Sequence, residues 1–191
     1  MRRFIVAVLL PLTFGAGFLA CGDSPTDPSG TSGNFRLMLT DGPFTDARAV
    51  LITFSDISVH RSGEGGFTSL PLDGGQQTCD LKRLQGAQDL LSLATLPAGH
   101  YTQVRLDVTR AVIYFDNVSA GSACATTIAP PAGRSASVDI PSGTIRLNRE
   151  FDVPAEGLTT MLLDLDGDRS IHATGNGRYM MNPVISIVSV H

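Results

Sequence analysis

The sequence predicts an all-β domain, an antiparallel β-sandwich of the immunoglobulin-like or transthyretin-like kind with about eight or nine short strands and little helix. Three observations support this prediction. The 191 residues include 20 Gly and 11 Pro, which imply many turns. Apolar and polar residues alternate with the period of two that is typical of half-buried strands, and no long segment has the helical period.

The strands expected from this alternation are separated by Gly, Pro, Asn and Asp turns. In chain order they cover residues 34–39, 49–60, 67–72, 101–115, 137–140, 144–153, 158–165, 171–173 and 179–190. Residues 80–93 fit neither period and are expected to form a strand end or a short helical turn. The Gly175-Asn176-Gly177 segment is expected to be the turn of a hairpin.

The second expected strand changes phase in its middle. Its apolar residues occupy even positions up to Phe54 and odd positions from Ile57 onward. Because the side chains of a strand alternate between two faces, a one-residue slip of this kind indicates a β-bulge. We therefore expect a bulge near Ser55 and Asp56.

The N-terminus has the features of a bacterial export signal. Met1-Arg2-Arg3 is positively charged, residues 4–12 are apolar, and small residues precede Cys21. This pattern resembles a lipobox, in which the cysteine is acylated and becomes the new N-terminus after cleavage. We therefore expect residues 1–20 to be a lipoprotein signal peptide and Cys21 to carry the lipid. The alternatives are a secretory signal cleaved after Gly17 and a retained single-pass anchor.

The rest of the chain is expected to comprise a tether and one domain. Residues 21–33 follow the signal with Gly, Pro, Ser, Thr and Asp and contain no aliphatic or aromatic side chain after the cysteine, so we expect a flexible polar linker there. Residues 34–191 would form the β-sandwich. The expected location is the cell envelope, and the outer membrane in a Gram-negative host.

The two cysteines of the expected domain are Cys79 and Cys124. An exported protein matures in an oxidising compartment, so a disulfide between them is the expected state. Two free thiols are the alternative. The formal net charge of −4 argues against a nucleic-acid partner.

Several segments together resemble the bacterial family called domain of unknown function 4382. The most specific is the string from Leu96 to Leu106, Leu-Pro-Ala-Gly-His-Tyr-Thr-Gln-Val-Arg-Leu. Leu39-Thr-Asp-Gly-Pro43, Ile57-Ser-Val-His60 and Leu163-Asp-Leu-Asp166 belong to the same pattern, and Gly42 departs from it. The resemblance implies an envelope-associated lipoprotein module and supplies no reaction.

The only candidate metal site is a cluster of aspartates, Asp164, Asp166 and Asp168. Carboxylates at alternate positions around a glycine can bind Ca²⁺, but the residues that complete an EF-type loop are missing here. The other interpretation is a strand that turns at Gly167, with Asp164 and Asp166 on its outer face. No cofactor is therefore predicted.

No catalytic set emerges from the remaining candidates. His60, His100, His172 and His191 are scattered, and no nucleophile elbow is present. The tyrosines Tyr101, Tyr114 and Tyr179 are expected to complete a sheet face or a turn. We therefore expect a lipid-anchored, non-enzymatic module that binds an envelope protein or a glycan, with the lipid bilayer as partner through Cys21. The alternative is a metal-dependent envelope hydrolase that uses the aspartate cluster.

Overall fold

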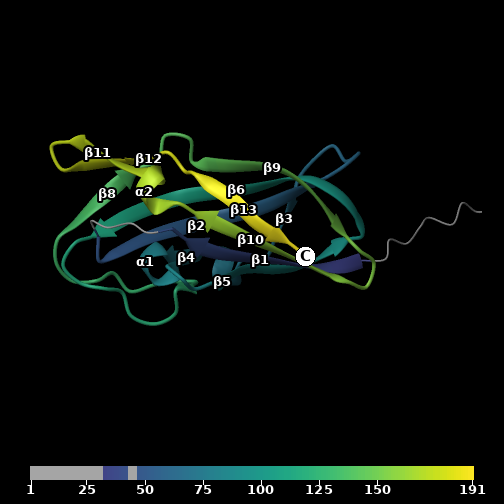
Figure 1. Cartoon of the computed structure of the whole chain (residues 1–191), viewed down its shortest axis with the longest axis horizontal. Helices are drawn as coiled ribbons and strands as arrows, with labels where there is room; N and C mark the ends of the chain where they lie inside the picture. The colour runs from purple at the N-terminus through teal and green to yellow at the C-terminus, as the bar shows by residue number, and fades with distance from the viewer. Residues whose placement is uncertain (1–31, 43–46) are drawn as a thin grey trace, which may run out of the picture.

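The computed structural model describes residues 32–42 and 47–191. Within these residues it contains thirteen strands, and helices are limited to three short turns, η1 (Asp73–Gly75), α1 (Leu81–Leu84) and α2 (Gly167–Ser170) (Figure 1). The strands are β1 (Ser32–Asp41), β2 (Ala49–Arg61), β3 (Thr68–Ser69), β4 (Gln77–Asp80), β5 (Asp89–Pro97), β6 (Gly99–Tyr114), β7 (Cys124–Ala125), β8 (Ser135–Asp139), β9 (Thr144–Val153), β10 (Leu158–Leu165), β11 (Ile171–Gly175), β12 (Arg178–Met181) and β13 (Ile185–Val190).

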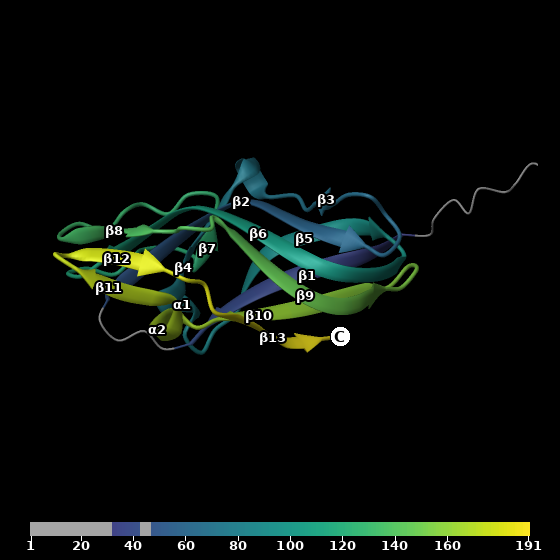
Figure 2. The ribbon, with the colours of Figure 1, turned by 90° about the horizontal axis from the view of Figure 1, so that it is seen from above.

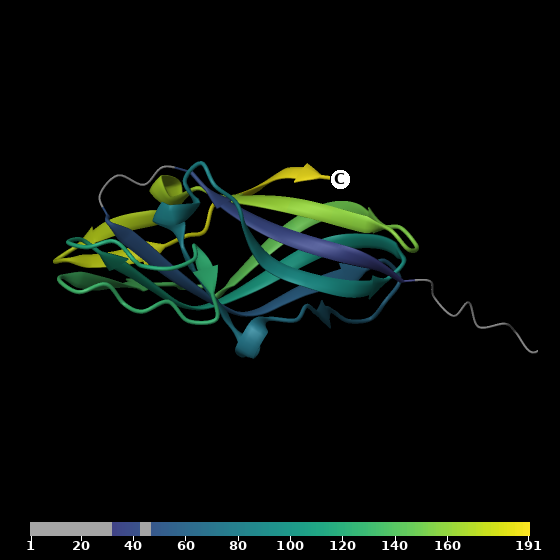
Figure 3. The ribbon, with the colours of Figure 1, turned by 90° about the horizontal axis from the view of Figure 1, so that it is seen from below.

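The strands form two sheets, which confirms the all-β, sandwich-like fold. A four-stranded sheet has the order β13-β10-β1-β5, and a nine-stranded sheet follows β11-β12-β8-β6-β2-β4-β7, with β3 beside β2 and β9 beside β6. Figures 2 and 3 show the two layers from opposite sides. The sequence pattern predicts antiparallel pairing throughout, and this is wrong for two pairs of strands. β1 and β10 run parallel, as do β12 and β8. Long connections rather than hairpins join these pairs, so parallel pairing is available to them.

The core lies between the sheets. Each sheet contributes side chains from alternate positions, and these are almost completely buried; examples are Phe35, Leu37, Leu39, Met161 and Leu163 from one sheet and Ile52, Ile57, Val104 and Leu106 from the other. A second, smaller cluster covers the opposite face of the nine-stranded sheet, where Ile128 packs on Leu51, Val112 and Tyr114.

The predicted bulge in β2 is confirmed. The register between β2 and β6 shifts on both sides of Phe54, which leaves Ser55 as an extra residue in β2 and Thr109 as an extra residue in β6. The bulge changes which side chains face the core. On the outer face of these strands, Ile128 covers the end near Leu51, whereas Asp56 and His60 are half-buried beyond the bulge, on the half that we call the open face.

Three boundaries differ from the sequence-based expectation. β5 lies in the segment that fitted neither period, because a register shift after Leu37 leaves Leu91 as an extra residue and breaks the alternation. The last expected strand is divided around Pro183 into β12 and β13, which join different sheets. β1 begins at Ser32, inside the expected linker. Gly33 therefore belongs to the packed domain, where a side chain at this position would lie 2.1 Å from the carbonyl oxygen of Pro154.

The start of β1 lies at one end of the elongated domain, and the β11–β12 hairpin lies at the other (Figures 1 and 2). Hydrogen bonds join the backbone of Ser32 and Asn34 to the β9–β10 loop at that first end. No helix among the described residues is both long enough and apolar enough to cross a membrane.

Candidate functional site

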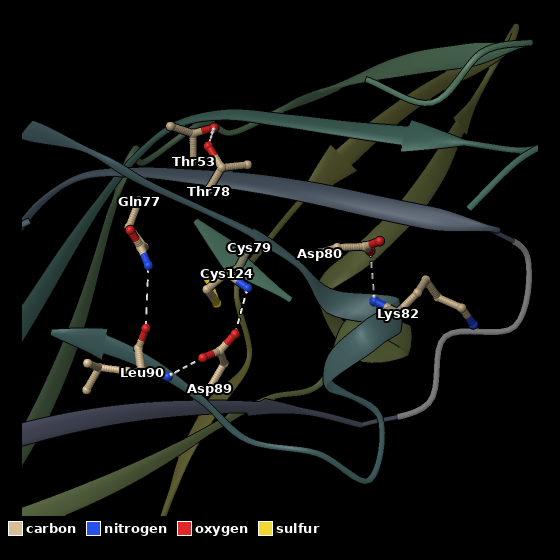
Figure 4. The surroundings of a disulfide bond; sticks show 9 residues. All are labelled: Thr53, Gln77, Thr78, Cys79, Asp80, Lys82, Asp89, Leu90 and Cys124. Atoms are coloured by element: carbon tan, nitrogen blue, oxygen red, sulfur yellow. Dashed lines mark hydrogen bonds between the residues drawn. A yellow bond between two sulfur atoms is a disulfide. The ribbon is translucent and has the colours of Figure 1, made fainter. Parts of the chain in front are cut away.

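The predicted disulfide is present and links β4 to β7. The sulfur atoms of Cys79 and Cys124 are 2.01 Å apart, and both residues are buried (Figure 4). The backbone N–H of Cys124 donates to a carboxylate oxygen of Asp89 at 2.9 Å, which ties β7 to the start of β5 as well. The disulfide therefore fastens the long segment between β6 and β8 to the sheet. Cys21, the expected lipidation site, lies outside the described residues.

The aspartates of the candidate calcium cluster have separate environments. Asp164 is half-buried on β10, whereas Asp166 caps α2 by accepting a hydrogen bond from the backbone N–H of Arg169 at 3.0 Å. Asp168 lies within α2, which replaces the simple turn expected at Gly167. Over residues 32–42 and 47–191, no group of three or more His, Cys, Asp or Glu side chains is placed to hold a metal ion.

A carboxyl group that the sequence did not single out lies near this cluster. Asp41, at the end of β1, is 5% exposed, and neither of its carboxyl oxygens accepts a hydrogen bond of ordinary geometry. Burial, and next the charge of Asp164, raise the pKa of Asp41 to about 8, although the backbone N–H of Gly167 and the charge of Lys82 oppose the rise. Asp41 is therefore largely protonated at neutral pH.

The tyrosines have structural roles, as expected. The hydroxyl of Tyr101 donates to the carbonyl of Pro97 at 2.8 Å, and its ring stacks on Phe151. Tyr114 belongs to the second cluster, and Tyr179 packs against Phe115. The histidines remain scattered. His100 forms an exposed pair with Asp152 at 2.9 Å, and His60 takes part in a surface hollow that the sequence did not predict.

This hollow, which we call the outer groove, lies on the open face of β2, β6 and β9. It is defined by His60, Phe67, Thr102, Gln103, Arg105 and Asn148 and has a volume of about 420 Å³. The strand register places His60, Gln103 and Asn148 next to one another across three strands. Their side chains leave the sheet on the same side because they occupy matching positions in the ladder.

The polar side chains of the outer groove hold one another in fixed positions. The amide nitrogen of Gln103 donates to the amide oxygen of Asn148, and Nε of Arg105 donates to the amide oxygen of Gln103 at 2.8 Å. One ring nitrogen of His60 lies 2.9 Å from the Thr102 hydroxyl, and the other lies 3.1 Å from the carbonyl of Glu64. The groove is therefore preorganised for a polar ligand.

Phe67 provides the apolar part of the outer groove. Its ring lies between His60, at a centroid distance of 5.1 Å, and the guanidinium carbon of Arg105, which is 3.5 Å from the ring centroid. Two further hollows adjoin the groove. One involves Arg149 and Glu150, and the other involves Arg61, Glu64 and Tyr101. Together they extend the polar surface toward the end of the domain where β1 begins.

Another hollow, separate from the outer groove and the two hollows beside it, lies on the covered half of the same sheet. This cleft of about 230 Å³ has threonine side chains, Arg110 and Gln76 at its rim and Leu51, Val112, Tyr114 and Ile128 at its base. It is smaller than most small-molecule sites. The disulfide-anchored segment supplies Thr127, Ile128 and Pro130, so this wall depends on the Cys79–Cys124 bond.

Sequence reasoning missed the outer groove because its residues come from three separate strands and from the loop before β3, which supplies Phe67. Each strand shows polar residues at alternate positions, and that signal marks a solvent-facing side only. The register that brings Gln103 beside both His60 and Asn148 depends on bulges between paired strands. The sequence of one strand does not show which residues of its partner lie opposite such a bulge.

The model of one protein family matches residues 32–183, and its description is domain of unknown function (DUF4382). This match covers most of the chain and includes both sheets. The chain belongs to this family. The resemblance proposed from the Leu96–Leu106 string is thereby confirmed for the DUF4382 domain.

Other comparisons add little about the DUF4382 domain. No curated protein matches the chain significantly. Among solved structures, a leucine-rich repeat protein from Bacteroides thetaiotaomicron VPI-5482 is 15% identical and has a TM-score of 0.28. That match covers 78% of the present chain and 14% of the other protein, and a similarity this low carries no argument about fold or function.

Proposed function

We propose that this DUF4382 protein is a lipid-anchored envelope protein that binds a glycan through the outer groove. The observation that carries the proposal is the preorganised row of His60, Gln103 and Asn148 on an open sheet face. Sugar hydroxyls both donate and accept hydrogen bonds, so they pair well with amide groups that are already held in place. Phe67 offers a partly exposed ring edge beside them.

The proposed anchor agrees with the position of the groove. The described domain begins at Ser32, which pairs with Pro97, and the hollow that adjoins the outer groove is lined by Pro97, Arg61 and Glu64 at this same end. An acylated Cys21 would be at most about 40 Å from Ser32 along a fully extended chain. The domain would thus bind a glycan close to the membrane surface.

The alternative suggested by the sequence, a metal-dependent hydrolase, has less support from the geometry. Asp166 already accepts a hydrogen bond as the cap of α2, and Asp164 and Asp168 come from different local structures. No histidine accompanies them in a metal-binding group among the described residues. We therefore propose a non-enzymatic binding role.

Glycan binding can be tested by calorimetry with purified protein and a panel of neutral and acidic oligosaccharides. We expect one or more to bind, and we expect Asn148→Ala to weaken that binding by about tenfold through loss of the amide. Asn34→Ala is a matched control, because Asn34 is an exposed amide on the four-stranded sheet. Equal losses in both variants, or no binding to any oligosaccharide, would overturn the proposal.

The anchor has a separate test in cells. Wild-type protein should fractionate with membranes, and globomycin, which blocks lipoprotein signal cleavage, should cause the precursor to accumulate. Cys21→Ser should release the protein from the membrane fraction while the domain retains its melting temperature. Membrane association of the Cys21→Ser protein would contradict lipid anchoring.

A further inference from the structure

We propose that the ligand of the outer groove is an acidic saccharide, which the groove recognises by binding an oxyanion between Arg105 and Arg146. This inference rests on the proposed glycan-binding function and specifies its ligand class. It follows from the way the guanidinium group of Arg105 is held and from the absence of an acidic partner for either arginine among residues 32–42 and 47–191.

The guanidinium group of Arg105 has a fixed orientation. Its carbon lies 3.5 Å above the Phe67 ring, and its Nε donates to Gln103 at 2.8 Å. These contacts use one face and one N–H group. The terminal nitrogens form no hydrogen bond or ion pair with any residue in the part of the chain that the structure describes. A planar guanidinium with a free edge matches the two oxygens of a carboxylate, sulfate or phosphate group.

Arg146 lies directly opposite Arg105 in the β6–β9 ladder. Like charges at opposing positions destabilise a sheet unless a counter-charge lies between them. Arg146 is exposed and has no hydrogen bond or ion pair within residues 32–42 and 47–191. A bound anion would supply the missing negative charge and bring both arginines into one contact.

The acidic side chains nearby do not fill this role. Asp107, on the next row of the ladder, accepts a hydrogen bond from the Thr144 hydroxyl at 2.7 Å and makes no ion pair with a described arginine. Glu150 lines the adjoining hollow beyond Asn148, where it would repel an anion. Asp56 lies opposite Asp107 on that same row, so acidic side chains flank the arginines on both sides, Asp56 and Asp107 on one and Glu150 on the other. The charges therefore confine an anionic group to the Arg105–Arg146 row itself and leave the Glu150 end to neutral parts of the ligand.

The hydrogen bonds within the groove also favour a ligand that is rich in acceptor oxygens. Arg105 donates to Gln103, and Gln103 donates to Asn148, so the amide nitrogen of Asn148 at the end of this chain of bonds donates to no residue that the structure describes. The terminal nitrogens of Arg105 are donors too. Donors that converge on an open hollow suit the ring and glycosidic oxygens next to an acidic group on a sugar.

The test compares matched acidic and neutral oligosaccharides by calorimetry on the purified protein. The carboxylate pair is oligogalacturonate and its methyl ester, and the sulfate pair is short dextran sulfate and dextran. We expect one acidic member to bind about tenfold or more tightly than its neutral partner, as the loss of a charge-assisted hydrogen bond predicts. Which pair shows the difference identifies the oxyanion.

Variants connect this preference to the arginines. Arg105→Gln and Arg146→Gln should each reduce binding of the acidic oligosaccharide to the level of its neutral partner. Arg105→Lys should keep only part of the wild-type preference, because lysine retains the charge but lacks the planar guanidinium group that binds two oxygens at once. Arg36→Gln, on the outer side of the four-stranded sheet, should change nothing. Because Arg146 is exposed, its replacement leaves the fold intact even if Arg105→Gln does not.

Each outcome decides between the two proposals. If acidic and neutral members bind equally and Asn148→Ala weakens both, the glycan-binding function stands and the acidic preference is wrong. If acidic members bind more tightly but Arg36→Gln weakens them as much as Arg146→Gln does, the binding is nonspecific charge attraction and the inference fails. If no oligosaccharide binds, both proposals fail.

Discussion

Two buried aspartates have opposite surroundings in this domain. Asp80, at the end of β4, is 0% exposed and accepts hydrogen bonds from the backbone N–H groups of Val50 and Lys82 and from the hydroxyl of Ser119. Asp41, at the end of β1, is 5% exposed and has no such partner. Burial alone therefore does not determine what a carboxyl group does for stability.

The difference lies in which groups each aspartate satisfies. Asp80 connects β2, the first turn of α1 and the segment after β6, so one side chain joins three parts of the chain. Figure 4 shows its hydrogen bond to Lys82 in α1. Asp41 accepts no hydrogen bond of ordinary geometry, and its ionised form is opposed by burial and by Asp164. We infer that Asp80 stabilises the fold and that ionised Asp41 destabilises it.

The largest expected effect comes from the disulfide next to Asp80. Replacing both Cys79 and Cys124 by Ala should lower the free energy of unfolding by about 4 kcal/mol, since the bond closes a loop with a sequence separation of 45. Urea denaturation of the purified protein measures the change. A loss below about 1 kcal/mol would mean that other contacts hold the segment before β8 without help from the disulfide.

Asp80→Ala should have the next largest effect. It leaves the N–H groups of Val50 and Lys82 without their acceptor, and we expect a loss of about 3 kcal/mol in urea denaturation. Asp80→Asn is the matched control, because its amide oxygen still accepts from both N–H groups. If the Ala and Asn variants lose the same stability, the hydrogen bonds are not the cause.

Asp41 should make stability depend on pH in the direction opposite to that of an ordinary paired carboxylate. Its folded-state pKa of about 8 exceeds the ordinary aspartate pKa of 3.8, so between these pH values the folded protein binds more protons than the unfolded protein. Stability should therefore fall as pH rises from about 4 to about 8, by at most about 1.4 kcal/mol per pH unit.

Asp41→Asn tests this dependence. The variant should match the wild type near pH 4 and exceed its stability at pH 9 by up to about 5 kcal/mol, because Asn cannot ionise. Urea denaturation across this pH range supplies the measurement. Parallel pH profiles for the two proteins would show that Asp41 is not the group responsible.

The smallest expected effect concerns an exposed carboxylate, Asp116. Side-chain hydrogen bonds from Arg134, at 2.9 and 3.1 Å, lower the pKa of Asp116. This pairing favours the folded state above the unfolded-state pKa and is lost as pH falls through the folded-state pKa. Arg134→Gln should raise the pKa of Asp116 in an NMR titration and leave the melting temperature almost unchanged. An unaltered pKa would contradict the assigned cause.

Local sequence patterns predicted much of this fold, because they depend on neighbouring residues. The phase change between Phe54 and Ile57 located the bulge, and Gly175-Asn176-Gly177 gave the β11–β12 hairpin, in which Asn176 and Gly177 both have positive φ. The disulfide followed from a pair of cysteines expected in an exported domain.

Features that depend on pairing between distant strands were not predictable in the same way. The alternation of β5 is broken at Leu91 by a bulge against β1. Asp41 looked like an ordinary turn residue, and its burial against Asp164 requires the parallel β1–β10 pair. The outer groove likewise depends on the registers of β2, β6 and β9.

The position of β1 also determines the order in which the domain can fold. β1 is the first described strand, yet it lies between β5 and β10, and its parallel partner begins only at Leu158. The four-stranded sheet therefore cannot close until most of the chain has been synthesised, and closing such a distant contact is slow. Until Leu158–Leu165 has been made, β1 can pair with β5 alone, so the half of the four-stranded sheet formed by β10 and β13 is the last part of that sheet to assemble.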